Sequence, residues 1–321
     1  MKHRLFVGLT VAVALLLPAV LTNFQLFQAT QVVVYAIALL GLHMVTGYGG
    51  QISIGHGAFF ALGGYGAALL MEHAHLPYAL TIPIVGLGCF AAGFAFGLPA
   101  LRLQGLHLAL ATLALAVAVP QTLKYFDVWS GGSEGLVLET PGVPAGLPLS
   151  ADQWIYILVL AIALLLFWLA NNLLCSRIGR AIVAVRDNPF AASAMGINLA
   201  LLKTTTFGLS AAYTGVAGAL SALSVAYVAP DSFRLLLSIY MLVGVVVGGL
   251  ASVSGAIWGA LFIFFVPNLA QHFSKAAPGI VFGAALFLVI YLMPSGIAGG
   301  VRRWVTKVDP KLPLESRHTE V

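Results

Sequence analysis

The sequence predicts an all-α polytopic membrane protein with about ten transmembrane or re-entrant helices and with both termini in the cytoplasm. Hydrophobic residues make up 60% of the chain and charged residues only 8%, whereas about a quarter of the residues of a soluble domain are charged. Apolar runs close to the roughly 20 residues that cross a bilayer recur along the whole chain. Lysine and arginine residues gather on one side of these runs, and this asymmetry sets the orientation.

Ten apolar stretches are candidate spans, and their order defines the predicted topology. They cover residues 5–22, 31–47, 53–71, 79–100, 107–123, 154–174, 204–228, 235–251, 255–271 and 279–294. The first stretch resembles a signal peptide, but it lacks a small-x-small cleavage site, so we expect an uncleaved span. A gap of three residues separates the stretches 235–251 and 255–271, which are either two short spans or one re-entrant hairpin.

Basic residues assign the two sides of the membrane. With ten spans and a cytoplasmic N-terminus, most of them lie inside: Lys2, Arg4, Arg102, Arg177, Arg180, Arg186, Lys203, Arg302, Arg303, Lys307, Lys311 and Arg317. Lys124, Arg234 and Lys275 lie outside. We therefore expect one transmembrane domain over residues 1–300, with an inner loop at 175–203, an outer loop at 124–153 and a basic cytoplasmic tail at 301–321.

The inner loop, residues 175–203, contains a short predicted helix. Asn188 can cap this helix, and Pro189 suits its first position. Gly196 can end it in a left-handed conformation. The helix over residues 189–195 would have about two turns, which is too short to persist alone in water. Its position between two spans points to a cytoplasmic protein that docks on it.

The most unusual span-embedded stretch is GYGGQISIGHGAFFALGGYGAALL, residues 47–70. Glycine weakens a transmembrane helix and exposes its backbone, which is tolerated only where protein or a water-filled cavity satisfies the backbone. Broken helices of this kind often line substrate sites. The candidate pathway residues are Gln51, Ser53, Gly55, His56 and Gly57. The alternative is close helix packing through small residues, which we favour for the later glycines Gly63, Gly64 and Gly66.

Several kinds of chemistry are excluded by the sequence. A lone histidine such as His56 is usually a neutral, hydrogen-bonded ring, and no Asp or Glu lies deep in a predicted span to relay protons with it. No P-loop motif and no metal-binding constellation occurs, so another polypeptide must bind any nucleotide. Basic residues at span ends do not form a nucleic-acid-binding face. Cys89 and Cys175 indicate no disulfide framework.

Six sequence blocks carry a resemblance to a known family. They are GYGGQISIGHGAFFALGGYGAALL (47–70), WSGGSEGL (129–136), GRAIVAVRDNPFAASAMGIN (179–198), LSAAYTGVAGAL (209–220), AYVAPDSF (226–233) and VVVGGLASVSGAIWGA (245–260). Together they resemble the permeases of branched-chain amino acid ABC transporters, and specifically the permease type with a Gly-Gly-Ser-x-Gly-Leu outer loop. The blocks follow the family's order and span most of the chain.

The resemblance implies a bacterial inner-membrane importer for branched-chain or other small hydrophobic amino acids. Its expected partners are two cytoplasmic ABC ATPases, a homologous second permease and a periplasmic binding protein. No cofactor and no catalytic residue is expected in this subunit, because ATP is hydrolysed on the ATPases. The expected coupling residues are Gly179, Arg180, Arg186, Asp187, Asn188, Pro189, Ala191, Ala192 and Gly196. Phe190 departs from the wider pattern of ABC permeases, which has an acidic residue at its position.

Two other functions would place different demands on the sequence. A stand-alone secondary carrier or channel would need no partner, but the chain lacks the intramembrane acid that commonly couples ion and solute movement. A membrane enzyme would need a cluster of polar residues at one membrane interface, and the sequence shows none.

Overall fold

The structure is a computed structural model that describes residues 20–308 together with residues 14, 17 and 18, apart from residues 102, 104, 140, 144–147 and 274–277. Most of the predicted first span (5–22) and the predicted tail beyond residue 308 lie outside the described residues. The predicted location of the two termini therefore stays a prediction.

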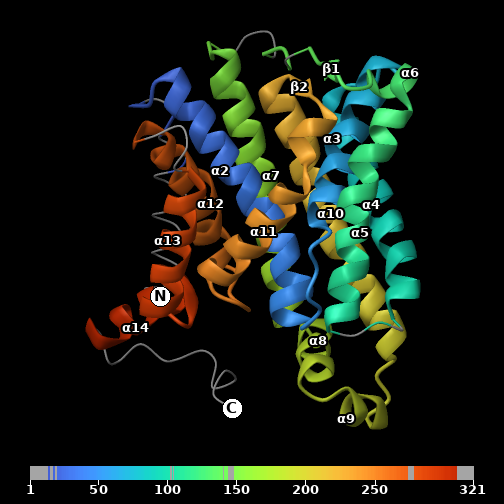
Figure 1. Ribbon diagram of the computed structural model, residues 1–321, viewed down its shortest axis with the longest axis vertical. Coiled ribbons are helices and arrows are strands. Elements are labelled where there is room, and N and C mark those ends of the chain that lie inside the picture. The colour runs from blue at the N-terminus through green and yellow to red at the C-terminus, as the bar shows by residue number, and fades with distance from the viewer. Residues whose placement is uncertain are drawn as a thin grey trace.

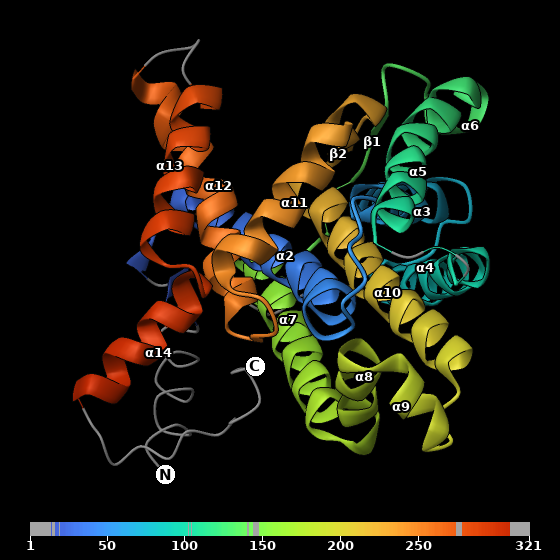
Figure 2. The ribbon, with the colours of Figure 1, turned by 60° about the horizontal axis from the view of Figure 1, so that its bottom comes forward.

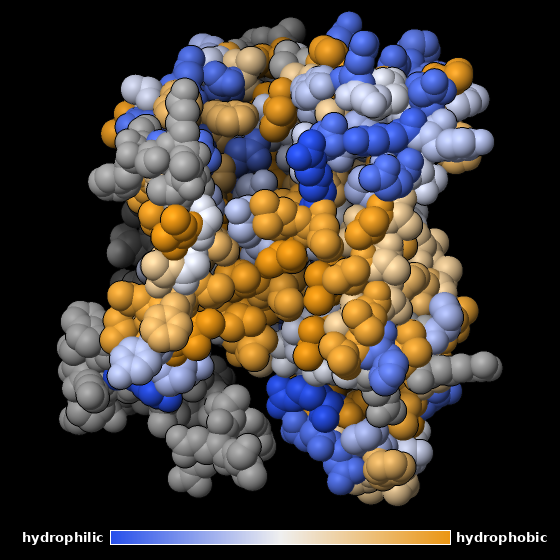
Figure 3. Space-filling view, viewed as in Figure 1, coloured by the Kyte–Doolittle hydropathy of each residue, from blue (hydrophilic) through white to orange (hydrophobic). Residues whose placement is uncertain are grey.

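Long helices lie side by side and form the body of the molecule (Figure 1). Within the described residues, nine of the ten predicted spans coincide with helices. These are α2 (Asn23–Leu42), α3 (His56–Glu72), α4 (Tyr78–Ala100), α5 (Leu106–Tyr125), α7 (Ala151–Cys175), α10 (Leu199–Val225), α11 (Leu235–Gly248), α12 (Gly255–Phe273) and α13 (Pro278–Leu292). In the part of the chain that the structure describes, six helical stretches are long and apolar enough to cross a membrane, those of α2, α4, α5, α7, α10 and α13. A hydrophobic band crosses the middle of one face, with hydrophilic residues above and below it (Figure 3).

Helices α11 and α12 correspond to the stretches 235–251 and 255–271, for which the sequence allowed either two short spans or one re-entrant hairpin. Helix α11 has 14 residues, which is a length of roughly 21 Å at 1.5 Å per residue. The turn that follows it approaches η1 (His43–Tyr48), the π-helix that continues α2, because a Cβ on Gly47 would lie 2.6 Å from the nitrogen of Ala251. The same turn packs on the start of α14 (Gly296–Val308), where a Cβ on Gly249 would lie 2.9 Å from the carbonyl oxygen of Ser295. Helix α11 is shorter than the roughly 30 Å hydrocarbon layer, so the choice between two short spans and a re-entrant hairpin stays open.

Helix α10 lies at the centre of the molecule, against α2, α3 and α4. Its contact with α3 is made by glycines: a Cβ on Gly63 would overlap the backbone of Gly215, and one on Gly218 would overlap the carbonyl group of Phe60. A Cβ on Gly66 would meet Val85 of α4 at 3.3 Å. Small residues let membrane helices approach closely, so the packing role predicted for the later glycines of residues 47–70 is confirmed.

The polypeptide between α2 and α3 is a broken helix, as the sequence predicted. Helix α2 continues as a π-helix, η1 (His43–Tyr48), in which the N–H group of Gly49 donates to the carbonyl oxygen of Met44 at 3.0 Å. The chain then runs extended beside α10 before α3 begins at His56 (Figure 1). Gly50 has a φ of +65°, a conformation that favours glycine.

The two ends of the bundle carry different short elements. One end, called the loop end here, carries α8 (Arg177–Asp187) and α9 (Pro189–Ala194), which lie between α7 and α10 (Figure 2). The other end, the strand end, carries α6 (Asp127–Ser130), η2 (Pro230–Phe233) and two strands. These strands, β1 (Leu136–Val137) and β2 (Tyr227–Val228), pair antiparallel, with Leu136 opposite Val228.

The sequence predicted that the transmembrane domain ends at residue 300, but helix α14 (Gly296–Val308) continues through this position. Residues 301–308 are therefore helical, and the predicted tail begins as a continuation of this helix. Apolar residues recur there at helical spacing (Ile297, Val301, Val305), which is the pattern of a helix with one apolar face. Cys89 is buried and Cys175 is exposed, and both are free cysteines in this structure.

Candidate functional site

The start of α3 is held by a chain of hydrogen bonds that joins three helices. Ser53 Oγ lies 2.8 Å from His56 Nδ1, and His56 Nε2 lies 2.6 Å from Ser210 Oγ on α10. Ser210 donates to the carbonyl oxygen of Gly41 on α2 at 2.6 Å. The side chains of Ser53 and Ser210 are fully buried, and His56 is 1% exposed. The network therefore holds the polypeptide between α2 and α3 (residues 43–55, called the broken segment here) against α2 and α10.

One arrangement of hydrogens satisfies every member of this network. Because Ser210 donates to Gly41, its oxygen accepts from His56 Nε2–H, and Nδ1 is left as an acceptor. The Ser53 hydroxyl donates to Nδ1, while its oxygen accepts from the N–H group of Gly55 at 3.3 Å. The hydrogen-bond pattern thus assigns a neutral ring with its proton on Nε2. Of the two interpretations of His56, this geometry favours the neutral, hydrogen-bonded ring over a proton relay.

Side chains of neighbouring helices accept hydrogen bonds from backbone N–H groups at the start of α3. The N–H group of Gly57 donates to Ser238 Oγ of α11 at 3.0 Å, and that of Ile54 donates to Thr112 Oγ1 of α5 at 3.0 Å. A Cβ on Gly57 would overlap Ser238 Oγ, and one on Gly55 would lie 2.6 Å from the carbonyl oxygen of Thr112. These two glycines therefore let α11 and α5 approach the broken segment. In this conformation the helix start is closed by hydroxyl groups.

Gln51 is the most open of the candidate pathway side chains, and it lies toward the loop end. It is partly exposed, whereas Ser53, Gly55, His56 and Gly57 are buried. A small open hollow lies beside it between the broken segment, α8 and α10. The hollow is lined by Gly49, Gln51, Ile182, Val185, Leu202, Lys203 and Thr206. The candidate pathway segment and the inner loop therefore both line this hollow, beside Gln51.

The short helix predicted in the inner loop is confirmed as α9. Asn188 caps it by accepting a hydrogen bond from the N–H group of Ala191 at 3.0 Å, and Pro189 occupies the first turn. Gly196 follows with a φ of +83°. The N–H groups of Gly196 and Ile197 bond the carbonyls of the last turn, which is the Schellman arrangement. The cap residues identified in the sequence thus define both ends of the helix.

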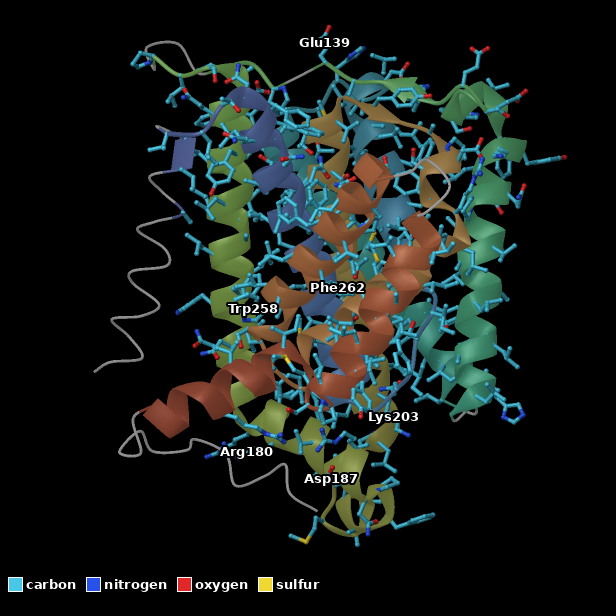
Figure 4. The ribbon with its side chains drawn as sticks, turned by 60° about the vertical axis from the view of Figure 1, so that its left-hand side comes forward. Glu139, Arg180, Asp187, Lys203, Trp258 and Phe262 are labelled. Atoms are coloured by element: carbon cyan, nitrogen blue, oxygen red, sulfur yellow. The ribbon has the colours of Figure 1, made fainter. Side chains whose placement is uncertain are left out.

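Helix α8 folds back against the end of α7 and positions the rest of the loop. A Cβ on Gly179 would overlap the carbonyl group of Leu174, so only glycine allows this approach. Arg180 donates to the carbonyl oxygen of Cys175 at 3.4 Å. Arg180 and Asp187 both lie at the loop end, on the side away from Glu139 (Figure 4). Arg186 instead reaches back into the bundle.

Apolar side chains of α9 and its C-terminus are exposed at the loop end. Phe190 is 87% exposed and Met195 is 84% exposed. Ala191 and Ala194 are exposed as well, while Ala192 is 4% exposed and faces the loop itself. The loop end lies beyond the hydrophobic band (Figure 3), and large apolar side chains exposed to water mark interaction sites.

The sequence did not reveal the partners of the broken segment. Ser210, Ser238 and Thr112 lie at least 56 residues from His56 along the chain, and each is a hydroxyl residue inside an apolar span. Hydroxyl residues in such spans were the available signal, because a buried hydroxyl group requires a hydrogen-bond partner. Their pairing depends on how the helices pack, which the sequence pattern does not specify.

The described residues hold no group of three His, Cys, Asp or Glu side chains that could bind a metal ion. The acidic residues in this part of the chain lie at helix ends and in loops: Glu72, Asp127, Glu134, Glu139, Asp152, Asp187 and Asp231. This placement agrees with the sequence expectation that acidic residues are absent from the membrane interior.

Comparison with known proteins gives consistent matches over most of the chain. The family described as branched-chain amino acid transport system / permease component matches residues 25–293. The high-affinity branched-chain amino acid transport system permease protein LivM of Escherichia coli K12 is 30% identical over 319 residues, which cover 92% of this chain and 75% of the relative. LivM of Salmonella typhimurium is 29% identical over 98% of this chain and 78% of its own length. LivH of Escherichia coli K12 is 26% identical over 83% of this chain and 91% of its own length. No solved structure matches the chain significantly.

Proposed function

The chain belongs to the branched-chain amino acid transport permease family, and we propose that it is the membrane-spanning subunit of an ATP-binding-cassette importer for branched-chain or related small hydrophobic amino acids. It is a transport protein and not an enzyme. As the relatives are permease proteins of bacterial transport systems, we place it in the inner membrane with the loop end in the cytoplasm. Its proposed partners are two ATPase subunits, a homologous second permease and a periplasmic binding protein.

The exposed apolar surface of α9 is the observation that carries this proposal. A helix of six residues cannot persist alone in water, yet here it is capped at both ends and presents Phe190 and Met195 to solvent. A short helix laid in a groove of a partner is a recognised mode of binding. Phe190 replaces the acidic residue of the wider pattern, so the proposed docking depends on shape and apolar contact more than on charge. The partner that receives α9 in this proposal is the ATPase.

The broken segment between α2 and α3 is the proposed wall of the solute pathway. Gln51, Gly55 and Gly57 would contribute side-chain and backbone groups to it, since unwound backbone can satisfy the polar ends of an amino acid. Ser53 and His56 would hold this wall in position through their bonds to α10. In the conformation described here the wall is closed by α5 and α11, so transport requires these helices to move away from it.

A co-purification experiment tests the docking proposal. Phe190→Ala combined with Met195→Ala should lower recovery of the ATPase subunits with the tagged permease by about tenfold or more, because anchors of this kind cost about 2 kcal/mol or more when truncated. The matched control is Val128→Ala combined with Val137→Ala, which removes side chains that are 86% and 80% exposed at the strand end. The control should recover the ATPases as the unmodified chain does. Equal recovery with the α9 variant would overturn the proposed docking.

A transport measurement tests the solute. Proteoliposomes that contain the permeases, the ATPases and the binding protein should accumulate leucine, isoleucine or valine only when ATP is present. Accumulation without ATP and without the ATPases would favour a stand-alone carrier instead.

A further inference from the structure

Arg186 is the residue of α8 that leaves the inner loop and enters the bundle. Its Nη1 donates to the carbonyl oxygen of Gly47 at 3.1 Å, and its side chain is 26% exposed. Asp187 orients the guanidinium group from the other side, with Asp187 Oδ1 2.8 Å from both Nε and Nη2. The planar guanidinium group thereby bonds a carboxylate along one edge and a backbone carbonyl through Nη1, in a fixed geometry that the flexible side chain of a lysine would not reproduce.

The backbone of Gly47 and Gly50 provides the binding surface for the Arg186 side chain. Gly47 lies in the last turn of η1, where helix carbonyl groups lack partners within the helix. Gly50 follows with a φ of +65°, and a Cβ at this position would lie 2.6 Å from Cγ of Arg186. The aliphatic part of Arg186 therefore packs directly on the backbone of Gly50. Both the conformation and the contact require glycine at this position.

Arg186 connects the proposed docking helix α9 to the broken segment between α2 and α3. On one side, Asp187 is followed immediately by Asn188, which caps α9. On the other side, Gly47 and Gly50 belong to the break that leads to the proposed solute wall at Gln51. A displacement of α9 therefore acts on the broken segment through one charge-assisted hydrogen bond and one packing contact.

We propose that Arg186 is the positioning residue that transmits movement of the docking helix α9 to the broken segment between α2 and α3. This inference rests on the proposed function and names the contact through which the ATPases would open the solute pathway. Loss of the Arg186 contact should separate ATP hydrolysis from transport without releasing the ATPases. Docking and transmission are distinct, because Phe190 and Met195 face outward while Arg186 faces the bundle.

The test uses the complete importer in proteoliposomes and measures solute uptake and ATP hydrolysis in the same sample. Arg186→Ala should retain the ATPases but move about tenfold less solute per ATP, a loss of about 1.4 kcal/mol of coupling. Arg186→Lys should restore only part of this ratio. The matched control is Arg177→Ala, which removes an exposed arginine from the same helix. A ratio for Arg186→Ala equal to that of the control would overturn the inference, and so would loss of the ATPases from this variant.

A distance measurement tests the inference without transport. Spin labels at Ile52 and Val137, which are 45% and 80% exposed, report the broken segment against the strand end in a chain whose native cysteines are replaced. Addition of a non-hydrolysable ATP analogue should change this distance in the unmodified importer and leave it unchanged with Arg186→Ala. The same distance change in both would overturn the inference. If Arg186→Ala does not accumulate, Gly50→Ala disturbs the same contact from the other side, with the same expected and contrary results.

The two levels of failure are distinguishable. If the unmodified importer takes up no amino acid or holds no ATPase, the proposed function is wrong whatever Arg186 does. If the unmodified importer works and Arg186→Ala matches Arg177→Ala, only the transmission role of Arg186 is wrong.

Discussion

Removing the hydroxyl group of Ser210 tests the network at the start of α3. In Ser210→Ala, His56 Nε2–H loses its acceptor at 2.6 Å, and the carbonyl oxygen of Gly41 loses a donor at 2.6 Å. Both groups lie in the protein interior, so neither finds water. A change of tautomer does not remove the cost. With the proton on Nδ1, His56 can donate to the second lone pair of Ser53 Oγ, but Nε2 is then an unpaired acceptor and the Ser53 hydroxyl loses the acceptor that Nδ1 had provided.

The expected cost follows from counting these bonds. Interhelical hydrogen bonds in membrane proteins average about 0.6 kcal/mol, so two such bonds give about 1.2 kcal/mol. An unpaired buried donor costs about 1–3 kcal/mol, which raises the upper limit. We therefore expect Ser210→Ala to lower the free energy of unfolding by about 1–3 kcal/mol.

A double-mutant cycle isolates the bond between the two helices. His56→Leu keeps the bulk of the side chain and removes both ring nitrogens, so Ser210→Ala should cost less in that background. The difference should give a coupling energy of about 0.5–2 kcal/mol, measured by unfolding in mixed detergent micelles. The control is Thr214→Val, since the Thr214 hydroxyl bonds only the Ser210 carbonyl of its own helix at 3.0 Å. A coupling energy near zero, or equal effects of Ser210→Ala and Thr214→Val, would refute the assigned network.

Three further predictions concern packing, capping and charge. Gly63→Ala should destabilise the chain by about 1–3 kcal/mol through overpacking against α10. Gly88→Ala, which has nothing within 4 Å of the added atom, should be neutral in the same micelle unfolding assay, and equal effects of the two substitutions would contradict the packing. Asn188→Ala should lower the protection of α9 amides against hydrogen exchange by about 1 kcal/mol and leave global unfolding unchanged, and undiminished protection would contradict the cap. Two basic neighbours, Lys124 and Arg234, hold the pKa of Asp231 below its ordinary value, so the ion pairs are stabilising above the ordinary pKa of about 3.9 and lost as the pH falls through the lowered value. A carboxyl ¹³C titration of Asp231 should therefore have a midpoint below that value, and a midpoint at or above it would show that the ion pairs do not form.

Local signals in the sequence predicted much of this structure. The apolar runs located nine helices in the described residues, because a transmembrane helix is defined by its length and composition. The cap residues Asn188 and Gly196 predicted α9 within one residue at each end, since capping depends on side chains adjacent to the helix. The glycines before His56 predicted the broken helix for the same reason.

Features that depend on packing between distant segments were not predicted. The contacts of Ser210 and Ser238 with the broken segment connect residues more than 150 positions apart. The contact of Arg186 with Gly47 spans 139 positions. Composition and periodicity describe one element at a time, so they identify a polar residue in a span without identifying its partner. The exposure of Phe190 likewise could not be predicted, because it depends on where α9 lies at the loop end of the bundle.

The backbone-to-backbone contact of α3 with α10 restricts how this molecule can change shape. Sliding one of these helices along the other would drive Gly63 or Gly218 against a residue with a side chain, and the interface offers no rotamers that could adjust. The two helices are therefore expected to travel as one rigid body. Access to the start of α3 must then come from the opposite flank, where Ser238 of α11 contributes a single hydroxyl bond that a small tilt can break.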